Sequence, residues 1–439
     1  MGKATFLGGI HTYDGKAMSK DKPTTLLLPK GDLVFPMSQH IGAPAKPIVE
    51  KGDKVLVGQK IGEATGFISA NIISSVSGTV KVVEKRLTVS GQMTESIVIE
   101  NDHEYKAVDG FGKLRDYTLL SKQEIRTIIK DAGIVGMGGA GFPTHVKLSP
   151  KEDSKIEYIL VNAAECEPYL TSDYRMLLEE TNKLVTGLKI ILSLFENAKG
   201  VIAIEDNKPE AINKLKEATL NETNIQVKIL KTKYPQGAER QLIYAATGRK
   251  LNSKMLPSDV GCIVNNVDTV ISICLAVAES TPLIRRIVTV TGDAIVNPRN
   301  FNVRTGTNYN EFVAEAGGFV AKPEKIISGG PMMGMSLFSL DIPVTKTSSA
   351  LLCFLKDDAA APETACIRCG RCIQACPSGL IPQKLLVTAE QFDDENFMKN
   401  NGMECTECGS CTYVCPAKRR ITQSMKQTRR SILNNKKKA

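Results

Sequence analysis

Eight cysteines near the C-terminal end constrain what this chain can fold into more than any other feature. They form two runs, Cys366-Ile-Arg-Cys369-Gly-Arg-Cys372-Ile-Gln-Ala-Cys376-Pro377 and Cys405-Thr-Glu-Cys408-Gly-Ser-Cys411-Thr-Tyr-Val-Cys415-Pro416. Both runs have the spacing C-x2-C-x2-C-x3-C-P, which is that of bacterial ferredoxins with two clusters. Two full copies of this spacing predict two 4Fe-4S clusters, and therefore a protein that transfers electrons.

The spacing also predicts how the eight thiolates divide between the clusters. Two-residue gaps let three thiolates surround one corner of a cubane, whereas the fourth cysteine lies a helical turn further on and faces the other cluster. Each proline is expected to end a short helix, because it cannot donate the next backbone hydrogen bond. The expected ligand sets are Cys366, Cys369, Cys372 and Cys415 for one cluster, and Cys405, Cys408, Cys411 and Cys376 for the other.

Structural zinc is the alternative for a cysteine-rich region. A tetrahedral zinc site uses two CxxC pairs, which would leave half of these thiols without a purpose. Ligand thiolates must stay reduced, so the pattern favours the cytoplasm over a disulfide-forming compartment. The remaining cysteines lie mostly in apolar surroundings and are expected to be small buried hydrophobic residues: Cys166, Cys262, Cys274 and Cys353.

The length of 439 residues, with 42% hydrophobic and 23% charged residues, predicts a folded chain of several domains. No stretch reaches the ~18 uninterrupted apolar residues of a membrane-spanning helix. The most apolar stretches, 184–195 and 270–278, are expected to be buried helices. The N-terminus lacks a continuous apolar segment, so no secretory signal is expected and any membrane contact would be peripheral.

The formal net charge of +9 is confined to the last residues of the chain. Residues 417–439 contain nine basic side chains and no acidic one. One interpretation is a solvated, frayed tail. The other is electrostatic docking to an acidic partner or to anionic lipid, where each basic residue adds about 1 kcal/mol. In either case, deletion of residues 424–439 is expected to leave iron and flavin content unchanged.

Residues 1–112 are expected to form an N-terminal β-domain, because short alternating runs between 40 and 100 are separated by glycines. The string VEKGDKVLVGQKIGEA…ISSVSGTVKVVE resembles the barrel-sandwich fold of biotinyl and lipoyl carriers. A carrier needs a lysine at the exposed hairpin, but none occurs between Lys60 and Lys81. The domain is therefore predicted to be structural rather than a swinging arm.

Residues 113–285 alternate between helix and strand patterns. A capping box, Ser121 to Glu124, begins a helix that Gly133 ends. Helices separate strands further on, which predicts a largely parallel sheet with ligands at the carboxyl ends of its strands, after Asn162 and Asp206. The expected strands are 156–162, 201–206 and 225–230, and the expected helices are 171–196 and 208–219.

Two smaller units are expected to follow. Residues 286–345 predict two strands around an Asn-Pro turn and then a helix near 309–316, closed by Gly317-Gly318. Residues 346–439 would hold the cluster domain and its basic tail, after the linker-like string KDDAAAP.

A glycine-rich run, Gly136-Met-Gly-Gly-Ala-Gly-Phe-Pro143-Thr-His-Val-Lys147, leads into an expected helix. Glycine N–H groups can hold a phosphate and Lys147 adds a positive charge, although a plain turn would look the same. Polar groups elsewhere favour a flavin site, since they suit a flavin's ring edge, ribityl chain and phosphate. They are Asn162-Ala-Ala-Glu165-Cys-Glu167-Pro168, Gly237-Ala-Glu239-Arg240 and Val264-Asn265-Asn266-Val-Asp268-Thr269.

GMGGAGFPTHVK, NAAECEP and VNNVDT resemble the flavin- and NADH-binding segments of the flavoprotein subunit of respiratory complex I. With GGIHTYDGK (8–16), QHIGAPAKPIVEKGD (39–53) and the doubled cysteine motif, the whole chain resembles the C subunit of the Rnf-type, ion-translocating ferredoxin:NAD oxidoreductase. This resemblance implies a multidomain α/β and α+β chain. Its parts would be a barrel-sandwich β-domain, a Rossmann-like complex I flavoprotein-type α/β domain, a β-grasp domain over 286–345, and an α-helical two-cluster ferredoxin-like domain.

The resemblance also implies site residues. Non-covalent FMN would be held by Gly136, Gly138, Gly139, Gly141, Lys147, Asn162, Asn265 and Asn266. Glu165 and Glu167, expected as catalytic residues, and Glu239 would contact flavin or nicotinamide, and Lys254 would meet the dinucleotide. At three positions the complex I pattern has an arginine, an aspartate and a ring that stacks on adenine, whereas this sequence has Met137, Ala164 and Pro150. These departures leave the NADH-binding mode open.

The function implied by the resemblance is that of a peripheral cytoplasmic redox subunit of a membrane-bound complex. Electrons from reduced ferredoxin would arrive through partner subunits, pass along the two clusters to FMN, and leave as a hydride on NAD. Ion translocation would belong to the partners. Two alternatives are a cobalamin (corrin) reductase subunit of the same architecture and an Fe-S-stabilised nucleic-acid-binding protein. The basic tail lacks interleaved aromatic residues, which disfavours the latter.

Overall fold

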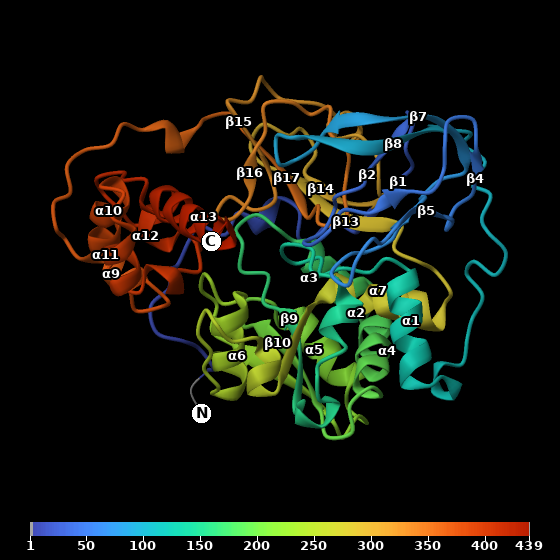
Figure 1. Cartoon of the computed structure of the whole chain (residues 1–439), viewed down its shortest axis with the longest axis horizontal. Coiled ribbons are helices and arrows are strands. Elements are labelled where there is room, and N and C mark those ends of the chain that lie inside the picture. Colours follow the sequence, from blue (N-terminus) through green and yellow to red (C-terminus); the bar gives the residue numbers. More distant parts are fainter. Residues whose placement is uncertain (1–2, 439) are drawn as a thin grey trace.

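The computed structural model describes residues 3–438 of the chain. The side chains of Lys436, Lys437 and Lys438, which belong to the expected basic tail, lie outside the described residues. Figure 1 shows a blue β-unit, a green and yellow α/β unit, a sheet that combines blue, yellow and orange strands, and a red helical unit.

The N-terminal β-unit consists of two small antiparallel sheets. One has the order β2 (Leu33–Pro36), β8 (Met93–Asn101), β7 (Gly78–Leu87) and β4 (Lys54–Val55), and the other β3 (Lys46–Pro47), β5 (Lys60–Glu63) and β6 (Ile72–Ile73). Inward-facing side chains of both sheets share one core, in which Phe35, Ile61 and Ile97 are fully buried. The alternating pattern between 40 and 100 therefore predicts the β-structure correctly.

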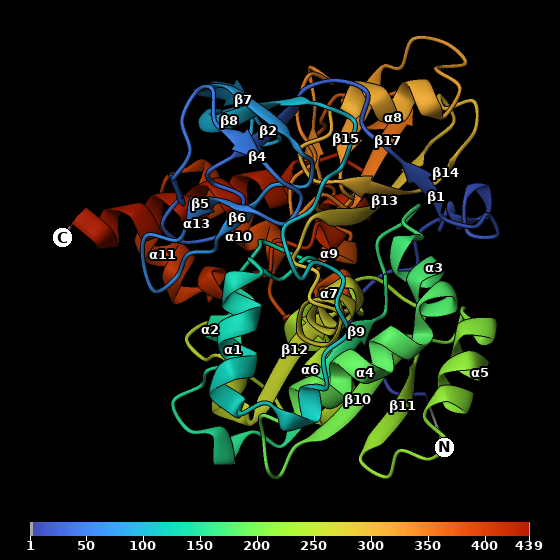
Figure 2. The same cartoon turned by 90° about the vertical axis from the view of Figure 1, so that its right-hand side faces the viewer.

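The α/β unit contains the expected parallel sheet. Its order is β11 (Ile225–Leu230), β10 (Lys199–Glu205), β9 (Tyr158–Ala163) and β12 (Cys262–Asn266), and every pair is parallel. Helices α1 (Lys122–Asp131), α5 (Pro209–Ala218) and α7 (Val267–Ala278) pack on one face, and α6 (Glu239–Thr247) covers the other through Leu242 and Ile243 (Figure 2). The capping box of α1 is present, and Gly133 follows it with φ +66°.

The single long helix expected over 171–196 is wrong. Two helices occupy that stretch, α3 (Ser172–Glu179) and α4 (Thr181–Leu192), because Glu180 leaves the helical region with φ −124° and ψ 30°. The Glu180 carboxylate pairs at this break with Arg285, 3.3 Å away. Helix α4 can then lie against α7, where Gly187 permits close approach: a Cβ at Gly187 would be 2.1 Å from the Val270 carbonyl oxygen.

The next unit contains a six-stranded sheet. Its order is β1 (Thr25–Leu27), β14 (Arg299–Arg304), β13 (Arg285–Thr291), β17 (Ala350–Phe354), β15 (Lys325–Ser328) and β16 (Met335–Ser336), and α8 (Tyr309–Glu315) packs on it. The expected strand–turn–strand–helix over 286–318 is confirmed. The boundary expected at residue 345 needs correction, because β17 follows it and pairs with both β13 and β15.

The C-terminal unit is helical, as expected, and follows a stretch (361–370) without helix or strand that curves around the outside (Figure 1). It contains α9 (Arg371–Ala375), α10 (Pro382–Glu390), α11 (Asp394–Lys399), α12 (Ser410–Tyr413) and α13 (Ile421–Lys438). In the part of the chain that the structure describes, no helix has both the length and the apolar character needed to cross a membrane.

Helix α13 corrects the expectation of a frayed tail that can be removed without consequence. Its residues Ile421, Met425 and Ile432 are buried in the core of the C-terminal unit, and Arg429 forms an ion pair with Glu407. The basic residues of this helix therefore lie on an element that also completes the hydrophobic core.

Ending the chain after Gln423 is expected to lower the iron content of the purified protein. The truncation removes Met425 and Ile432 from the core, and truncating even one such side chain costs about 2–5 kcal/mol. Ending the chain after Leu433 leaves this core intact and serves as the control. Equal iron contents in the two truncated proteins, after the same anaerobic reconstitution, would contradict the structural role of α13.

Candidate cofactor sites

One cavity in the helical unit is lined by four cysteines from both runs. Three of them belong to the first run and the fourth, Cys415, belongs to the second: Cys366, Cys369, Cys372 and Cys415. Cys366 and Cys369 are exposed, so this cavity lies at the surface. The structure thus gathers the four thiols that the spacing assigns to one cluster.

A second cavity is lined by the other four cysteines, namely Cys376, Cys405, Cys408 and Cys411. None of these four is exposed. Backbone N–H groups of Leu380 and Glu407 donate to the Sγ atoms of Cys376 and Cys405, at 3.4 and 3.3 Å. Four thiols around each cavity, with backbone donors directed at sulfur, fit two 4Fe-4S clusters.

The cysteines outside the two runs divide into two kinds. Cys262, Cys274 and Cys353 are buried, and burial raises the pKa of their thiols to about 11, 12 and 12, as expected for small hydrophobic residues. Cys166 differs, because its Sγ accepts a hydrogen bond from the Gly237 N–H at 3.2 Å. It is only partly buried, lies at the edge of the candidate flavin site and packs against the hydrophobic cluster of Ile10, Tyr234 and Ala375.

The glycine-rich run forms a loop between α1 and α2 (Thr144–Lys147). The Gly136 N–H donates to the Phe142 carbonyl at 2.8 Å, which closes the loop. Gly139 faces open space, since a Cβ there would meet no atom within 4 Å. Gly138 lies against Asn266: a Cβ added at Gly138 would be 2.8 Å from the Cβ of Asn266. An exposed loop with bare backbone suits the close approach of a phosphate or a planar ring.

Amides at the ends of two adjacent strands lie beside this loop. Asn162 of β9 pairs in register with Asn266 of β12. Asn265 is buried, and neither polar atom of its amide has a hydrogen-bond partner among the residues that the structure describes. A buried amide without partners is costly, so it is suited to a polar ligand such as the ribityl chain of FMN.

Lys147 also lies at the end of β12. Its Nζ donates to the Val264 carbonyl at 2.8 Å, and burial lowers its pKa while the carboxylate of Glu239 opposes that shift. The loop, the two strand ends and this partly buried lysine together fit the phosphate and ribityl chain of FMN.

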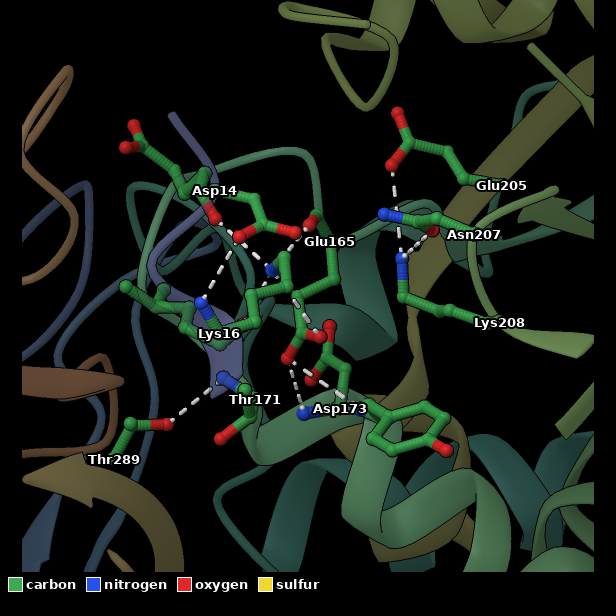
Figure 3. Close-up of polar contacts among 12 residues, drawn as sticks. Asp14, Lys16, Glu165, Thr171, Asp173, Glu205, Asn207, Lys208 and Thr289 are labelled. Carbon is green, nitrogen blue, oxygen red and sulfur yellow. Dashed lines mark hydrogen bonds and ion pairs between the residues drawn. The ribbon is translucent and has the colours of Figure 1, made fainter. Parts of the chain in front are cut away.

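Two glutamates lie on the loop that follows β9, and both carboxylates point into the protein (Figure 3 shows Glu165). Glu165 Oε1 accepts from the Asp173 N–H at 2.7 Å, at the start of α3. Glu167 Oε2 accepts from the Met332 N–H at 3.1 Å, and burial raises the pKa of Glu167 to about 7. Burial and the neighbouring Glu165 likewise raise the pKa of Asp173 to about 7.

Other predicted positions lie outside the glycine loop itself, although the carboxylate of Glu239 is close enough to Lys147 to act on its pKa. Lys254 is exposed on a turn beside the helical unit, where the neighbouring Ser253 donates to Glu404 at 2.6 Å. Glu239 is the exposed first residue of α6. The loop after Asp206 was expected to be part of the site. The Asp206 carboxylate instead accepts a hydrogen bond from the Thr232 hydroxyl at 2.5 Å. The roles of Glu239 and Lys254 towards NAD(H) stay predictions.

The departures from the complex I pattern have clear structural environments. Met137 is buried in the core of the α/β unit, and its N–H donates to Thr269 Oγ1 at 3.0 Å. The side chain at the position of the usual arginine therefore points away from the loop surface. Ala164 is also buried, and Pro150 is partly exposed beyond α2.

Sequence reasoning missed two residues that join the second cysteine cavity to the candidate flavin site. The Tyr234 hydroxyl donates to the Cys408 carbonyl at 2.7 Å, and Tyr234 packs in one cluster with Cys166 and Met332. Met332 in turn binds Glu167 through its N–H. Neither residue belongs to a recognised motif, so only the folded structure identifies them.

Family models match four successive parts of the chain. They are the RnfC barrel sandwich hybrid domain over residues 4–104, the Nuo51 FMN-binding domain over 129–275, the SLBB domain over 287–336 and the 4Fe-4S dicluster domain over 365–418. The chain therefore contains an FMN-binding domain and a dicluster domain.

Similar proteins align over almost the whole chain. The chain is 46% identical to the C subunit of the proton-translocating ferredoxin:NAD(+) oxidoreductase complex of Clostridium ljungdahlii, covering 95% of this chain and 92% of the relative. It is 42% identical to the C subunit of the Na(+)-translocating ferredoxin:NAD(+) oxidoreductase complex of Acetobacterium woodii, covering 99% and 98%.

A solved structure shares part of the fold. The air-oxidised NAD+-reducing NiFe hydrogenase aligns with a TM-score of 0.50 at 18% identity, covering 64% of this chain and 54% of that chain. At this identity the likeness concerns the fold alone.

Replacing Cys376 by serine is expected to damage the cluster held mainly by the second run, because Cys376 lines the cavity of Cys405, Cys408 and Cys411. Cys415→Ser should damage the other cluster. The electron paramagnetic resonance (EPR) spectrum of each reduced variant identifies the cluster that is lost. The opposite outcome, in which each serine damages the cluster of its own run, would show that the cross-assignment is wrong.

Gly139→Glu is expected to abolish FMN binding while both clusters remain. The open space at Gly139 would receive a carboxylate that blocks and repels the flavin phosphate. Gly139→Gln has the same size without the charge and should retain more flavin. Flavin and iron contents of the two variants provide the measurement, and full flavin content in Gly139→Glu would remove this loop from the site.

Proposed function

Because the chain belongs to the family of C subunits of ion-translocating ferredoxin:NAD(+) oxidoreductase complexes, we propose that it is the redox subunit that passes electrons between two 4Fe-4S clusters, FMN and NAD(H). FMN supplies the conversion between the single electrons of the clusters and the hydride of the nicotinamide. One contact in the fold supports this proposal most directly: through Tyr234 and Met332, the second four-cysteine cavity adjoins the loop that carries Glu165 and Glu167.

This contact also suggests the order of the centres. Tyr234 and Met332 join the second cavity to the Glu167 loop, whereas the cavity of Cys366 and Cys369 opens at the surface. We infer that the outer cluster exchanges electrons with a partner subunit. The inner cluster, on Cys376 and the second run, then exchanges electrons with the flavin.

The flavin-holding residues divide by role. The N–H groups around Gly138 and Gly139 would hold the phosphate, and Asn265, with its unpartnered amide, would bind the ribityl chain. Asn162, Asn266 and Lys147 would keep the strand ends in place, since each already bonds to a neighbouring loop, helix or strand. Glu165, Glu167 and Glu239 remain the candidates for contact with flavin or nicotinamide, and Lys254 remains the candidate for contact with the dinucleotide.

The setting of the protein also belongs to the proposal. Reduced ferredoxin would deliver electrons indirectly, through membrane-bound partner subunits, and this chain would lie on the cytoplasmic side of the membrane. Exposed bases on and before α13, such as Lys418, Lys426 and Arg430, are candidates for docking, because Arg419 and Arg420 already pair with Glu363. Rossmann-like and β-grasp architectures are the folds we infer for the α/β unit and the six-stranded sheet.

An anaerobic cofactor count followed by reduction with NADH tests the function. The expected protein contains about eight iron, about eight sulfide and about one FMN per chain, following two 4Fe-4S centres. NADH should then bleach the flavin absorbance and produce the EPR signal of reduced clusters. A protein that contains zinc, or a loaded protein whose clusters stay oxidised in excess NADH, would contradict the proposal.

A further inference from the structure

The N-terminal segment Gly8–Lys16 lies between the helical unit and the candidate flavin site. In Figure 1 the dark blue chain passes between the red helices and the α/β unit. Ile10 exchanges two backbone hydrogen bonds with Tyr234, at 2.8 and 2.9 Å. The segment therefore contacts the same tyrosine that binds the Cys408 carbonyl.

One end of the segment is held by Lys16 at the start of the short helix η1 (Lys16–Met18), as Figure 3 shows. The Lys16 ammonium donates to three carbonyls of a single loop, those of Glu165 at 3.0 Å, Glu167 at 3.1 Å and Leu170. It also lies 3.6 Å from Glu165 Oε2. Lys16 is 8% exposed, so these contacts replace water as partners of a buried charge.

The rest of this end fits the same loop closely. The Asp14 carbonyl accepts from the Tyr169 N–H at 2.6 Å. A Cβ at Gly15 would lie 2.4 Å from the Tyr169 ring. The loop from Glu165 to Leu170 is therefore held by the Lys16 charge and by the backbone hydrogen bond between Tyr169 and Asp14.

The other end of the segment meets the second cysteine cavity. The Gly9 N–H donates to the Ala375 carbonyl at 3.0 Å. Gly8 has φ +76°, and an added Cβ would lie 2.6 Å from the carbonyl oxygen of Cys376. Only glycine permits this approach at this backbone angle. A span of nine residues (8–16) thus connects a proposed cluster ligand to the backbone of Glu165 and Glu167.

We propose that residues 8–16 form a strap that fixes the Glu165–Leu170 loop relative to the second cysteine cavity, with Lys16 as its positioning residue. The proposal rests on the proposed function, because the two places that the strap joins are those of the inner cluster and the flavin. The rate of electron transfer between two centres falls as the distance between them grows. A strap with fixed ends keeps that separation constant.

Lys16 also has an electrostatic effect that packing alone would not produce. Burial raises the pKa of Glu167, and the Lys16 charge opposes that rise. Other groups around Glu167 are the N–H groups of Met332 and Met333, with Cys166 and Tyr234 nearby. Removing the Lys16 charge therefore raises the pKa of Glu167 further. A rate that needs this carboxyl ionised would reach its half-maximum at a higher pH.

Lys16→Met tests the flavin end of the strap in the full, reconstituted chain. We expect iron and FMN contents as in the unmodified protein and at least about a tenfold slower passage of electrons from NADH to the clusters. The pH at half-maximal rate should move upward. Lys16→Arg, which keeps the charge, should restore part of the rate and the pH profile. Lys22→Met is the control, since Lys22 is exposed and its ammonium donates to the Pro298 carbonyl rather than to the Glu165–Leu170 loop.

Gly8→Val tests the cluster end independently, including the case in which Lys16→Met fails to fold. We expect NADH to reduce the flavin at the normal rate and the clusters to be reduced several-fold more slowly. Gly91→Val is the matched control, because Gly91 has φ +75° and no atom within 4 Å of an added Cβ. It imposes the same backbone strain without the contact.

Rates in Gly8→Val that equal those in Gly91→Val, at normal iron and FMN content, would overturn the strap. An unchanged rate and pH profile in Lys16→Met would overturn the role of Lys16. If the unmodified chain itself contained no iron or FMN, the proposed function would fail instead, so the two failures are distinguishable.

Discussion

The parallel pairing of β9 with β12 is the constraint on which the candidate flavin site depends. Their register places Asn162 beside Asn266 at one edge of the sheet. Parallel strands require crossover helices, and the helices that follow these two strands, α3 and α7, begin at the same edge. The Glu165 carboxylate binds the first N–H groups of α3, and the Asn266 side chain caps α7. The junction of each strand with its helix is therefore fixed by a side chain that binds the first N–H groups of the helix.

Buried lysines hold in place loops that strand pairing in the sheet does not fix. Lys16 binds three carbonyls of the Glu165–Leu170 loop, and Lys208 donates to the Ala164 carbonyl. Lys346, whose pKa burial lowers to about 7, binds the carbonyls of Asn71 and Gly133, which belong to different units. Lys16 and Lys346 replace their lost hydration by several backbone acceptors, whereas Lys208 has one carbonyl and the side chains of Asn207 and Glu205. Removing one of these lysines would leave its acceptors unpaired. Lys346 also joins two units whose hydrophobic cores are separate.

Local patterns in the sequence predicted the helices and strands well where the hydrophobic residues of a segment follow a single period. The strand Ile225–Leu230, the capped helix after Ser121 and the strand pair around Asn297-Pro298 are all confirmed. The break at Glu180 was missed, because no glycine or proline marks it and its ion-pair partner, Arg285, lies more than a hundred residues away. The burial of Met425 in α13 was missed for a related reason, since the basic residues around it suggested a solvated tail.

The candidate sites show the same limit. Cysteine spacing predicted which thiols line each cavity, because a short helix sets the direction of the fourth cysteine. The glycine loop and the strand-end amides were recognised from their motifs. Lys16, Tyr234 and Met332 were not, since their importance depends on which distant loops they touch, and a lysine within GGIHTYDGK shows no such contact in the sequence.

The order of the two clusters is the central claim and can be tested by removing one cluster at a time. In Cys405→Ser, which lacks the inner cluster, NADH should reduce the flavin while the outer cluster stays oxidised on the timescale of turnover. In Cys366→Ser, which lacks the outer cluster, NADH should still reduce the inner one. Rapid-freeze EPR after mixing with NADH measures both. Normal reduction of the outer cluster in Cys405→Ser would contradict the account.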